Sequence, residues 1–115
     1  MNAREEALKR SRFEVDETAR KVADLERTIR DFEALAFDLD RQIKNEEALT
    51  KIEDPDHFAY SSFARSARAR RDKLYASTEG LNAQLEATHE ERDAAMERLS
   101  RIEALAAQEN LPRGH

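Results

Sequence analysis

The fold is decided by residues 15–43, which read VDETARKVADLERTIRDFEALAFDLDRQI. An apolar residue recurs every seven positions, at Val15, Val22, Ile29, Ala36 and Ile43. These are the a positions of a heptad, and Leu25, Phe32 and Leu39 occupy d positions between them. Such a repeat is typical of a helix that buries one narrow stripe against another helix.

The same repeat extends outward on both sides of a single interruption. Toward the N-terminus it reaches Leu8, and no proline or glycine occurs before Pro55. A second, weaker heptad runs from Tyr60 to Ala106 and contains one glycine, Gly80. Because each stripe is too thin to be stable alone, we predict an all-α fold, a long antiparallel two-helix coiled-coil hairpin. The expected parts are a helix over 1–53, a turn or hairpin tip over 54–61, a helix over 62–109 and a flexible tail over 110–115.

The interruption Asp54-Pro55-Asp56-His57 has the composition of a turn. Two starts of the second helix fit the sequence. Asp54 is able to cap a helix whose first residue is Pro55, or Ser61 or Ser62 caps a later start.

An antiparallel pair sets a positions of one helix against d positions of the other. The favoured register pairs Ala36 with Leu74, Phe32 with Thr78 and Ile29 with Leu81. Large side chains then meet small ones along much of the seam. Sliding by one heptad instead places Leu25 against Arg92, so we expect the first register.

Composition argues against several classes of protein. The chain has 115 residues, a net charge of −5 and no cysteine, and 66 residues are Ala, Glu, Lys, Leu or Arg. Large apolar residues are too few for a thick core with a concave cleft, so we expect no enzyme, no cofactor and no metal site. His89-Glu90-Glu91-Arg92-Asp93 lacks the second histidine of a zinc-binding helix. The sequence contains neither an apolar run of membrane-spanning length nor a signal peptide, which predicts a cytoplasmic protein.

A basic block, Arg65–Lys73, follows the turn and carries five cations and one anion. Residues 76–109 carry eight acidic and three basic side chains. The block has three interpretations: ion pairs with acidic residues of the first helix, an acidic protein partner, or nucleic acid. The lack of interleaved aromatic platforms argues against nucleic acid.

Several apolar residues lie off the heptad stripe. They are Phe13, Phe37, Leu49, Ile52, Phe58 and Phe63. Most of them, with Tyr60, belong to the turn end of the hairpin. Such a group either packs together as a small end-core or forms an interaction surface.

The turn and the start of the second helix resemble those of alphaproteobacterial FliJ-type flagellar export proteins. The similar stretch is Asp54-Pro55-Asp56-His57-Phe58-Ala59-Tyr60-Ser61-Ser62-Phe63-Ala64, continued by Arg70-Arg71-Asp72-Lys73-Leu74. Tyr60-Ser61-Ser62-Phe63 matches the family's Tyr-x-x-Phe step. Phe13-Glu14-Val15-Asp16-Glu17 matches its F-x-V-D-E segment near the N-terminus.

The resemblance implies a non-catalytic antiparallel coiled coil that serves flagellar type III protein export. Family members work at the cytoplasmic face of the flagellar base, touch the membrane only through partners and contact the export ATPase, the export gate and export chaperones. Positions beside the turn contact the gate, which points to Phe63 and Ala67, with Arg70 and Leu74 further along. The opposite helix ends, near residues 5–25 and 92–108, form the ATPase end.

Together, the resemblance and the pattern give a set of candidate partner-binding residues: Phe37, Phe58, Tyr60, Phe63, Ala67, Arg68 and Arg70. We expect a monomer or weak homo-oligomer that binds no nucleic acid. Two alternatives stay open. One is a nucleic-acid-binding or other adaptor hairpin that uses the Arg65–Lys73 block, and the other is a homodimeric structural coiled coil.

Overall fold

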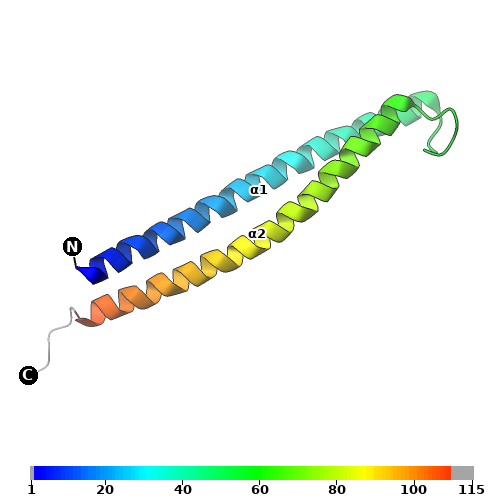
Figure 1. The fold of residues 1–115 in the computed structure, drawn as a ribbon. Helices are drawn as coiled ribbons and strands as arrows, with labels where there is room; N and C mark the ends of the chain where they lie inside the picture. The colour runs from blue at the N-terminus through cyan, green and yellow to red at the C-terminus, as the bar shows by residue number, and fades with distance from the viewer. Residues whose placement is uncertain (1, 110–115) are drawn as a thin grey trace, which may run out of the picture. The chain divides into compact units, whose positions relative to one another are not determined.

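The computed structural model describes residues 2–109 and contains two α-helices joined by one loop (Figure 1). Helix α1 spans Ala3–Thr50 and helix α2 spans Ser62–Glu109, and each has 48 residues. The helices pack antiparallel, which confirms the predicted all-α helical hairpin. The tail expected at 110–115 lies outside the described residues.

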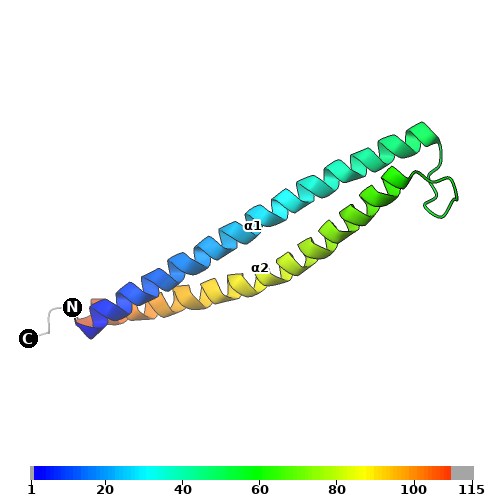
Figure 2. The ribbon, with the colours of Figure 1, turned by 45° about the horizontal axis from the view of Figure 1, so that its top comes forward.

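The chain divides into two compact units. The first, here called the loop unit, is Leu25–Ala83 and contains the connection between the helices (Figure 2). The second, here called the terminal unit, combines the described residues up to Asp24 with those from Gln84 to Glu109. In each unit, a segment of α1 packs against a segment of α2.

Burial along both helices follows the predicted heptads. The buried residues of α1 and α2 are Ser11, Thr18, Val22, Ile29, Ala36, Leu39, Ile43, Ala64, Ala67, Thr88 and Ala95, and all of them occupy a or d positions. The remaining a and d positions of the two helices between Leu8 and Ala106 are half-buried, with one exception. Thr50 is exposed because it is the last residue of α1.

The core of the loop unit is a thin layer of large and small side chains. Leu39, Ile43 and Ala67 form one apolar cluster, and Leu74 packs against it. Ala64 is completely buried. Alanine at these contacts permits a close approach of the two helix backbones, since the distance between packed helices depends on the side chains between them.

Contacts in the loop unit follow the expected register. That register places Ile43 opposite Ala67, and both residues belong to the same cluster. It also places Arg71 one residue from Asp40, and Nη1 of Arg71 lies 2.7 Å from Oδ1 of Asp40. A slide by one heptad would move these partners apart by about 10 Å.

The seam of the terminal unit is more polar. Ser11, Thr18 and Thr88 are buried there together with Val22 and Ala95. The hydroxyls of Thr18 and Thr88 donate to carbonyl oxygens of their own helices, at 2.9 Å to Val15 and 2.8 Å to Gln84. These internal bonds satisfy the hydroxyls but contribute no bond between the helices.

Three ion pairs link α1 and α2 at the surface of the terminal unit. Arg4 pairs with Glu109, Arg98 pairs with Glu14, and Arg12 lies 3.9 Å from Glu103. All six side chains are well exposed, so each pair contributes little stability.

Helix α1 begins and ends with recognisable caps. The side-chain oxygen of Asn2 accepts a 2.8 Å hydrogen bond from the backbone N–H of Glu5, which satisfies one of the free donors of the first turn. At the other end, Lys51 has a φ of 61°, and its N–H donates to the carbonyl oxygen of Glu47 at 2.8 Å. This left-handed residue ends α1 at Thr50, three residues before the expected position.

Helix α2 starts at the later of the two positions that the sequence allows. The hydroxyl of Ser61 accepts a 3.2 Å hydrogen bond from the N–H of Ala64. The backbone carbonyl oxygen of Ser61 accepts a 2.9 Å hydrogen bond from the N–H of Arg65. Ser61 is therefore the N-cap. Asp54 and Pro55 belong to the loop and not to a helix.

We predict that Gly80→Ala raises the free energy of unfolding by about 1 kcal/mol. Gly80 lies inside α2, and a Cβ atom there would meet nothing within 4 Å, so only helix propensity changes. Urea unfolding followed by far-UV circular dichroism measures this difference. Ala76→Gly, at an exposed position of the same helix, is the matched control and should lower the free energy by a similar amount. An unchanged or lower value for Gly80→Ala would contradict the prediction.

A second pair of variants tests the N-cap of α2. Ser61→Ala should lower the free energy of unfolding by about 1 kcal/mol, because the N–H of Ala64 loses its acceptor. Ser62→Ala, at the exposed first residue of the helix, should change it by less than about 0.5 kcal/mol. Equal effects of the two substitutions in urea unfolding would show that Ser61 is not the cap.

Candidate functional site

The loop between the helices is held by local hydrogen bonds. The N–H of His57 donates to the carbonyl oxygen of Asp54 at 3.1 Å, closing a turn with Pro55 at its second position, where the fixed φ of proline is favourable. The Asp54 carboxylate accepts from the N–H of Asp56 at 2.9 Å. The N–H of Tyr60 donates to the carbonyl oxygen of His57 at 3.0 Å. The loop thus has a defined conformation, which fixes the direction of its side chains.

This conformation presents Phe58 to solvent. Phe58 is 96% exposed, and its ring stacks on the ring of His57 with centroids 4.8 Å apart. The His57 ring is oriented in turn, because its Nδ1 accepts a 3.0 Å hydrogen bond from the N–H of Ala59. Phe63, in the first turn of α2, is 54% exposed. Two phenylalanine rings are therefore available to a partner at the turn, and they do not form a closed end-core.

Tyr60 has a structural role instead. Its side chain is buried, and its hydroxyl donates a 2.7 Å hydrogen bond to Oε2 of Glu47. Burial, followed by this bond to Glu47, raises the pKa of the Tyr60 phenol. Arg65 lies over the ring at 5.5 Å, and Arg68 lies 3.8 Å from the Glu47 carboxylate. The candidate Tyr60 therefore fastens the loop to α1 and has little free surface.

Ala67 is also buried and is part of the core of the loop unit. A residue at a d position of the seam is covered by the opposite helix, so its methyl group supports the hairpin and is not exposed to a partner. Of the seven candidates, Phe37, Phe58, Phe63 and Arg70 are exposed, and Arg68 is half-buried. Phe37 is 64% exposed on α1.

Asp40 is the centre of a polar contact between α1 and α2. It accepts a 2.7 Å hydrogen bond from Nη1 of Arg71 and one of 2.9 Å from the hydroxyl of Tyr75. The bond from Arg71 holds the pKa of the Asp40 carboxyl below its ordinary value. The same carboxylate raises the pKa of the Tyr75 phenol, since it accepts the phenolic proton.

The basic block is largely engaged within the hairpin. Arg71 is bonded to Asp40 and Asp72, Arg68 lies near Glu47, and Arg65 covers the ring of Tyr60. Within residues 2–109, Arg70 and Lys73 have no ion-pair or hydrogen-bond partner. This split supports the first interpretation of the block, ion pairing with α1, for two of its five cations, Arg68 and Arg71.

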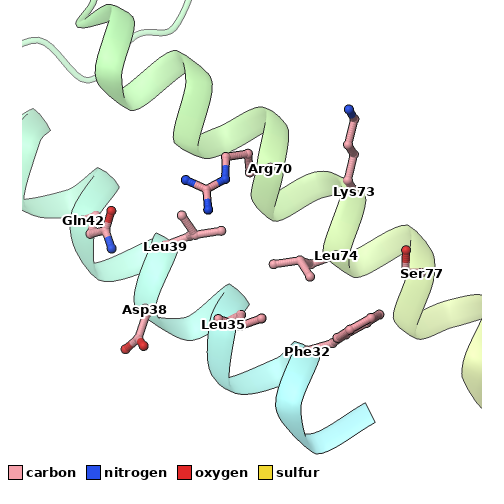
Figure 3. A pocket seen from close by; sticks show the side chains of 9 residues that line it. All are labelled: Phe32, Leu35, Asp38, Leu39, Gln42, Arg70, Lys73, Leu74 and Ser77. Carbon is pink, nitrogen blue, oxygen red and sulfur yellow. The ribbon is translucent and has the colours of Figure 1, made fainter. Parts of the chain in front are cut away.

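An apolar groove lies beside these two free cations, within the loop unit (Figure 3). It is an open depression of about 410 Å³ between α1 and α2. The side chains that line it are Phe32, Leu35, Asp38, Leu39, Gln42, Arg70, Lys73, Leu74 and Ser77. Sequence reasoning missed Leu35, which is 53% exposed. Its spacing from Phe32 and Leu39, three and four residues away on one helix face, is the signal that would have revealed the groove.

The terminal unit carries a different set of exposed apolar residues: Phe13, Met96 and Leu105. Phe13 borders a shallow hollow that also contains Glu14, Glu17, Lys21, Glu91 and Arg98. This surface is mixed in charge, and its cations and anions are close enough to neutralise one another, as the Arg98–Glu14 pair does.

Two kinds of feature are absent from the described residues. Neither helix offers a stretch of the length and hydropathy needed to cross a bilayer. Within residues 2–109, no three His, Cys, Asp or Glu side chains are grouped so as to hold a metal ion.

The fold and the exposed surface define a class: an antiparallel α-helical hairpin that presents one phenylalanine from its loop and another from the first turn of α2. No family model matches the sequence, and no curated protein or solved structure is significantly similar to it.

The Asp40 contact gives a pH-dependent prediction. The pKa of the Asp40 carboxyl is lower in the folded chain than its value of about 4 in the unfolded chain. Asp40 therefore stabilises the fold at pH values above about 4, and this contribution is lost as the pH falls through the folded pKa. Asp40→Asn should therefore lower the urea midpoint at pH 7, and the difference from the parent chain should shrink in acid.

The matched control for this experiment is Asp38→Asn, on the same helix. Asp38 is exposed and has no hydrogen-bond partner within residues 2–109. Its substitution should leave the midpoint nearly unchanged at both pH values. A deficit of Asp40→Asn that persists undiminished at pH 2 would contradict the assignment.

Proposed function

We propose that this chain is a non-catalytic accessory component of flagellar type III protein export. In this role it contacts the export ATPase and the export gate at the cytoplasmic face of the flagellar base, and it takes part in handling export chaperones. The proposal starts from the resemblance of Asp54–Ala64, Arg70–Leu74 and Phe13–Glu17 to FliJ-type proteins. The antiparallel helical hairpin supports it, because this is the fold that the resemblance implies.

The observation that carries the proposal is the exposure of Phe58 on a loop of fixed conformation. An aromatic side chain that is almost entirely in water gains about 1.5–3 kcal/mol when a partner buries it. The cost of ordering the loop is already met by its turn bonds, so more of this gain remains as binding free energy. Phe63, in the first turn of α2, is a second exposed aromatic side chain next to the loop.

The nucleic-acid alternative receives less support. Three of the five cations of the basic block are engaged by acidic or aromatic groups of the hairpin itself. The two free cations, Arg70 and Lys73, border an apolar groove. Two phosphate contacts would give only a shallow dependence of affinity on salt.

We predict that Phe58→Ala combined with Phe63→Ala weakens binding to the purified cytoplasmic domain of the export gate by about 100-fold. Loss of two aromatic anchors at the centre of an interface costs about 3 kcal/mol. Both residues are exposed, so helicity and the urea midpoint should change little. Titration calorimetry with the gate domain measures the affinity.

Phe13→Ala is the matched control, because Phe13 is an exposed phenylalanine that belongs to the terminal unit, which the proposal assigns to the ATPase. It should leave gate binding unchanged, and the double variant should still bind the export ATPase. A folded Phe58→Ala/Phe63→Ala protein that binds the gate normally would defeat the role of the loop.

A further inference from the structure

The two flanks of the seam in the loop unit differ in chemistry. On one flank, here called the pairing flank, Asp40 and Glu47 of α1 are satisfied by Arg71, Tyr75 and Arg68 of α2. The other flank, here called the groove flank, contains the apolar groove and has no ion pair between the helices among the described residues.

The groove is built from both helices. Phe32, Leu35 and Leu39 of α1 face Leu74 of α2 across it (Figure 3). Leu35 keeps 53% of its surface exposed even though it lies beside the seam. The smaller Ser77 stands across the groove from Phe32 and fills little of the space (Figure 3). An apolar depression thus remains open on the groove flank, while Asp40 and Glu47 are paired with residues of α2 on the pairing flank.

The charges at the rim of the groove are unequal. Arg70 and Lys73 stand on the α2 side, one turn apart, and neither has a partner within residues 2–109. Asp38 stands on the α1 side, and its carboxylate points away from both cations (Figure 3). A ligand of this groove therefore meets one positive charge that is directed at it, Arg70, and a second on the same edge, Lys73, whose side chain points away from the groove in Figure 3.

We propose that the groove binds an amphipathic helix of a partner protein, with an apolar face and an acidic edge. The stretch from Phe32 to Gln42 is about 15 Å long, which matches about ten residues of a helix laid along it. Apolar side chains of the partner at i, i+3 or i+4, and i+7 would enter the groove, as in other helix-in-groove complexes. Acidic side chains one turn apart would pair with Arg70 and Lys73. The result is a local three-helix bundle.

This surface is distinct from the loop contact through Phe58 and Phe63, and the inference does not depend on the flagellar proposal. An acidic helix fits better than nucleic acid because the groove wall is mainly leucine and phenylalanine. It fits better than a second copy of this chain because the exposed apolar residues of the acidic part of α2, Met96 and Leu105, are nine residues apart and do not form one helical stripe.

The test uses two labelled synthetic helices and fluorescence anisotropy. One probe is an alanine-based peptide of about 14 residues with leucines at i, i+3 and i+7 and two glutamates one turn apart on one edge. The other has lysines in place of the glutamates. The parent chain should bind the glutamate probe at least about tenfold more tightly than the lysine probe, and high salt should reduce that preference.

Two variants assign the binding to the groove. Leu35→Ala should weaken the binding of the glutamate probe at least about tenfold. The double variant Arg70→Glu/Lys73→Glu should bind the lysine probe more tightly than the glutamate probe. Phe37→Ala and the pair Arg30→Glu with Arg41→Glu are matched controls. They change exposed α1 residues that do not line the groove and should leave binding unchanged. The Phe58→Ala/Phe63→Ala protein should also bind normally, which separates this inference from the loop contact.

Three results would overturn the inference. The first is that the parent chain binds both probes equally tightly, or binds neither of them. The second is an unchanged preference in the charge-reversed variant, whose circular dichroism shows that it is folded. The third is a dimer in sedimentation equilibrium that Leu35→Ala converts to monomer, because the occupant of the groove would then be a second copy of the chain.

Discussion

The narrowness of the helix–helix seam is the constraint on which the rest of this molecule depends. Only a and d positions are buried, and many of them are alanine, serine or threonine. Neither helix has enough apolar surface to be stable alone, so each is helical largely because the other covers its stripe. The polar ties beside the seam, Tyr60 to Glu47 and Arg71 to Asp40, join residues far apart in the chain and favour one register over its neighbours.

A narrow seam also leaves most of each helix free for recognition. In the loop unit, the two flanks of the seam differ in how much surface they leave free. The pairing flank has ion pairs between the helices, while the groove flank keeps Leu35 on the surface together with Arg70 and Lys73, which have no partner among residues 2–109. The loop adds Phe58, whose exposure is fixed by turn hydrogen bonds and not by packing. Surfaces of this kind suit a protein that works by holding other proteins, which is the role we propose for it in flagellar export.

The hairpin could be predicted from the sequence because a seven-residue period constrains burial strongly, and every buried helical residue lies where that period places it. The candidate site was less predictable. Ser61 and Asp54 have similar capping chemistry, and only the path of the loop decides between them. Tyr60 and Ala67 are covered by the opposite helix, although their sequence neighbourhood indicates a binding surface. Leu35 was missed because the exposure of a residue beside the seam depends on the size of its cross-helix neighbours, which periodicity does not specify.

Backbone hydrogen exchange, measured by mass spectrometry with and without the purified cytoplasmic domain of the export gate, tests the central claim most directly. That claim is that the loop end of this hairpin recognises a protein of the export apparatus. We expect slower exchange in peptides that cover residues 56–63, and no change in peptides from residues 84–109. Protection confined to residues 84–109, or no protection anywhere at saturating gate domain, would contradict the account.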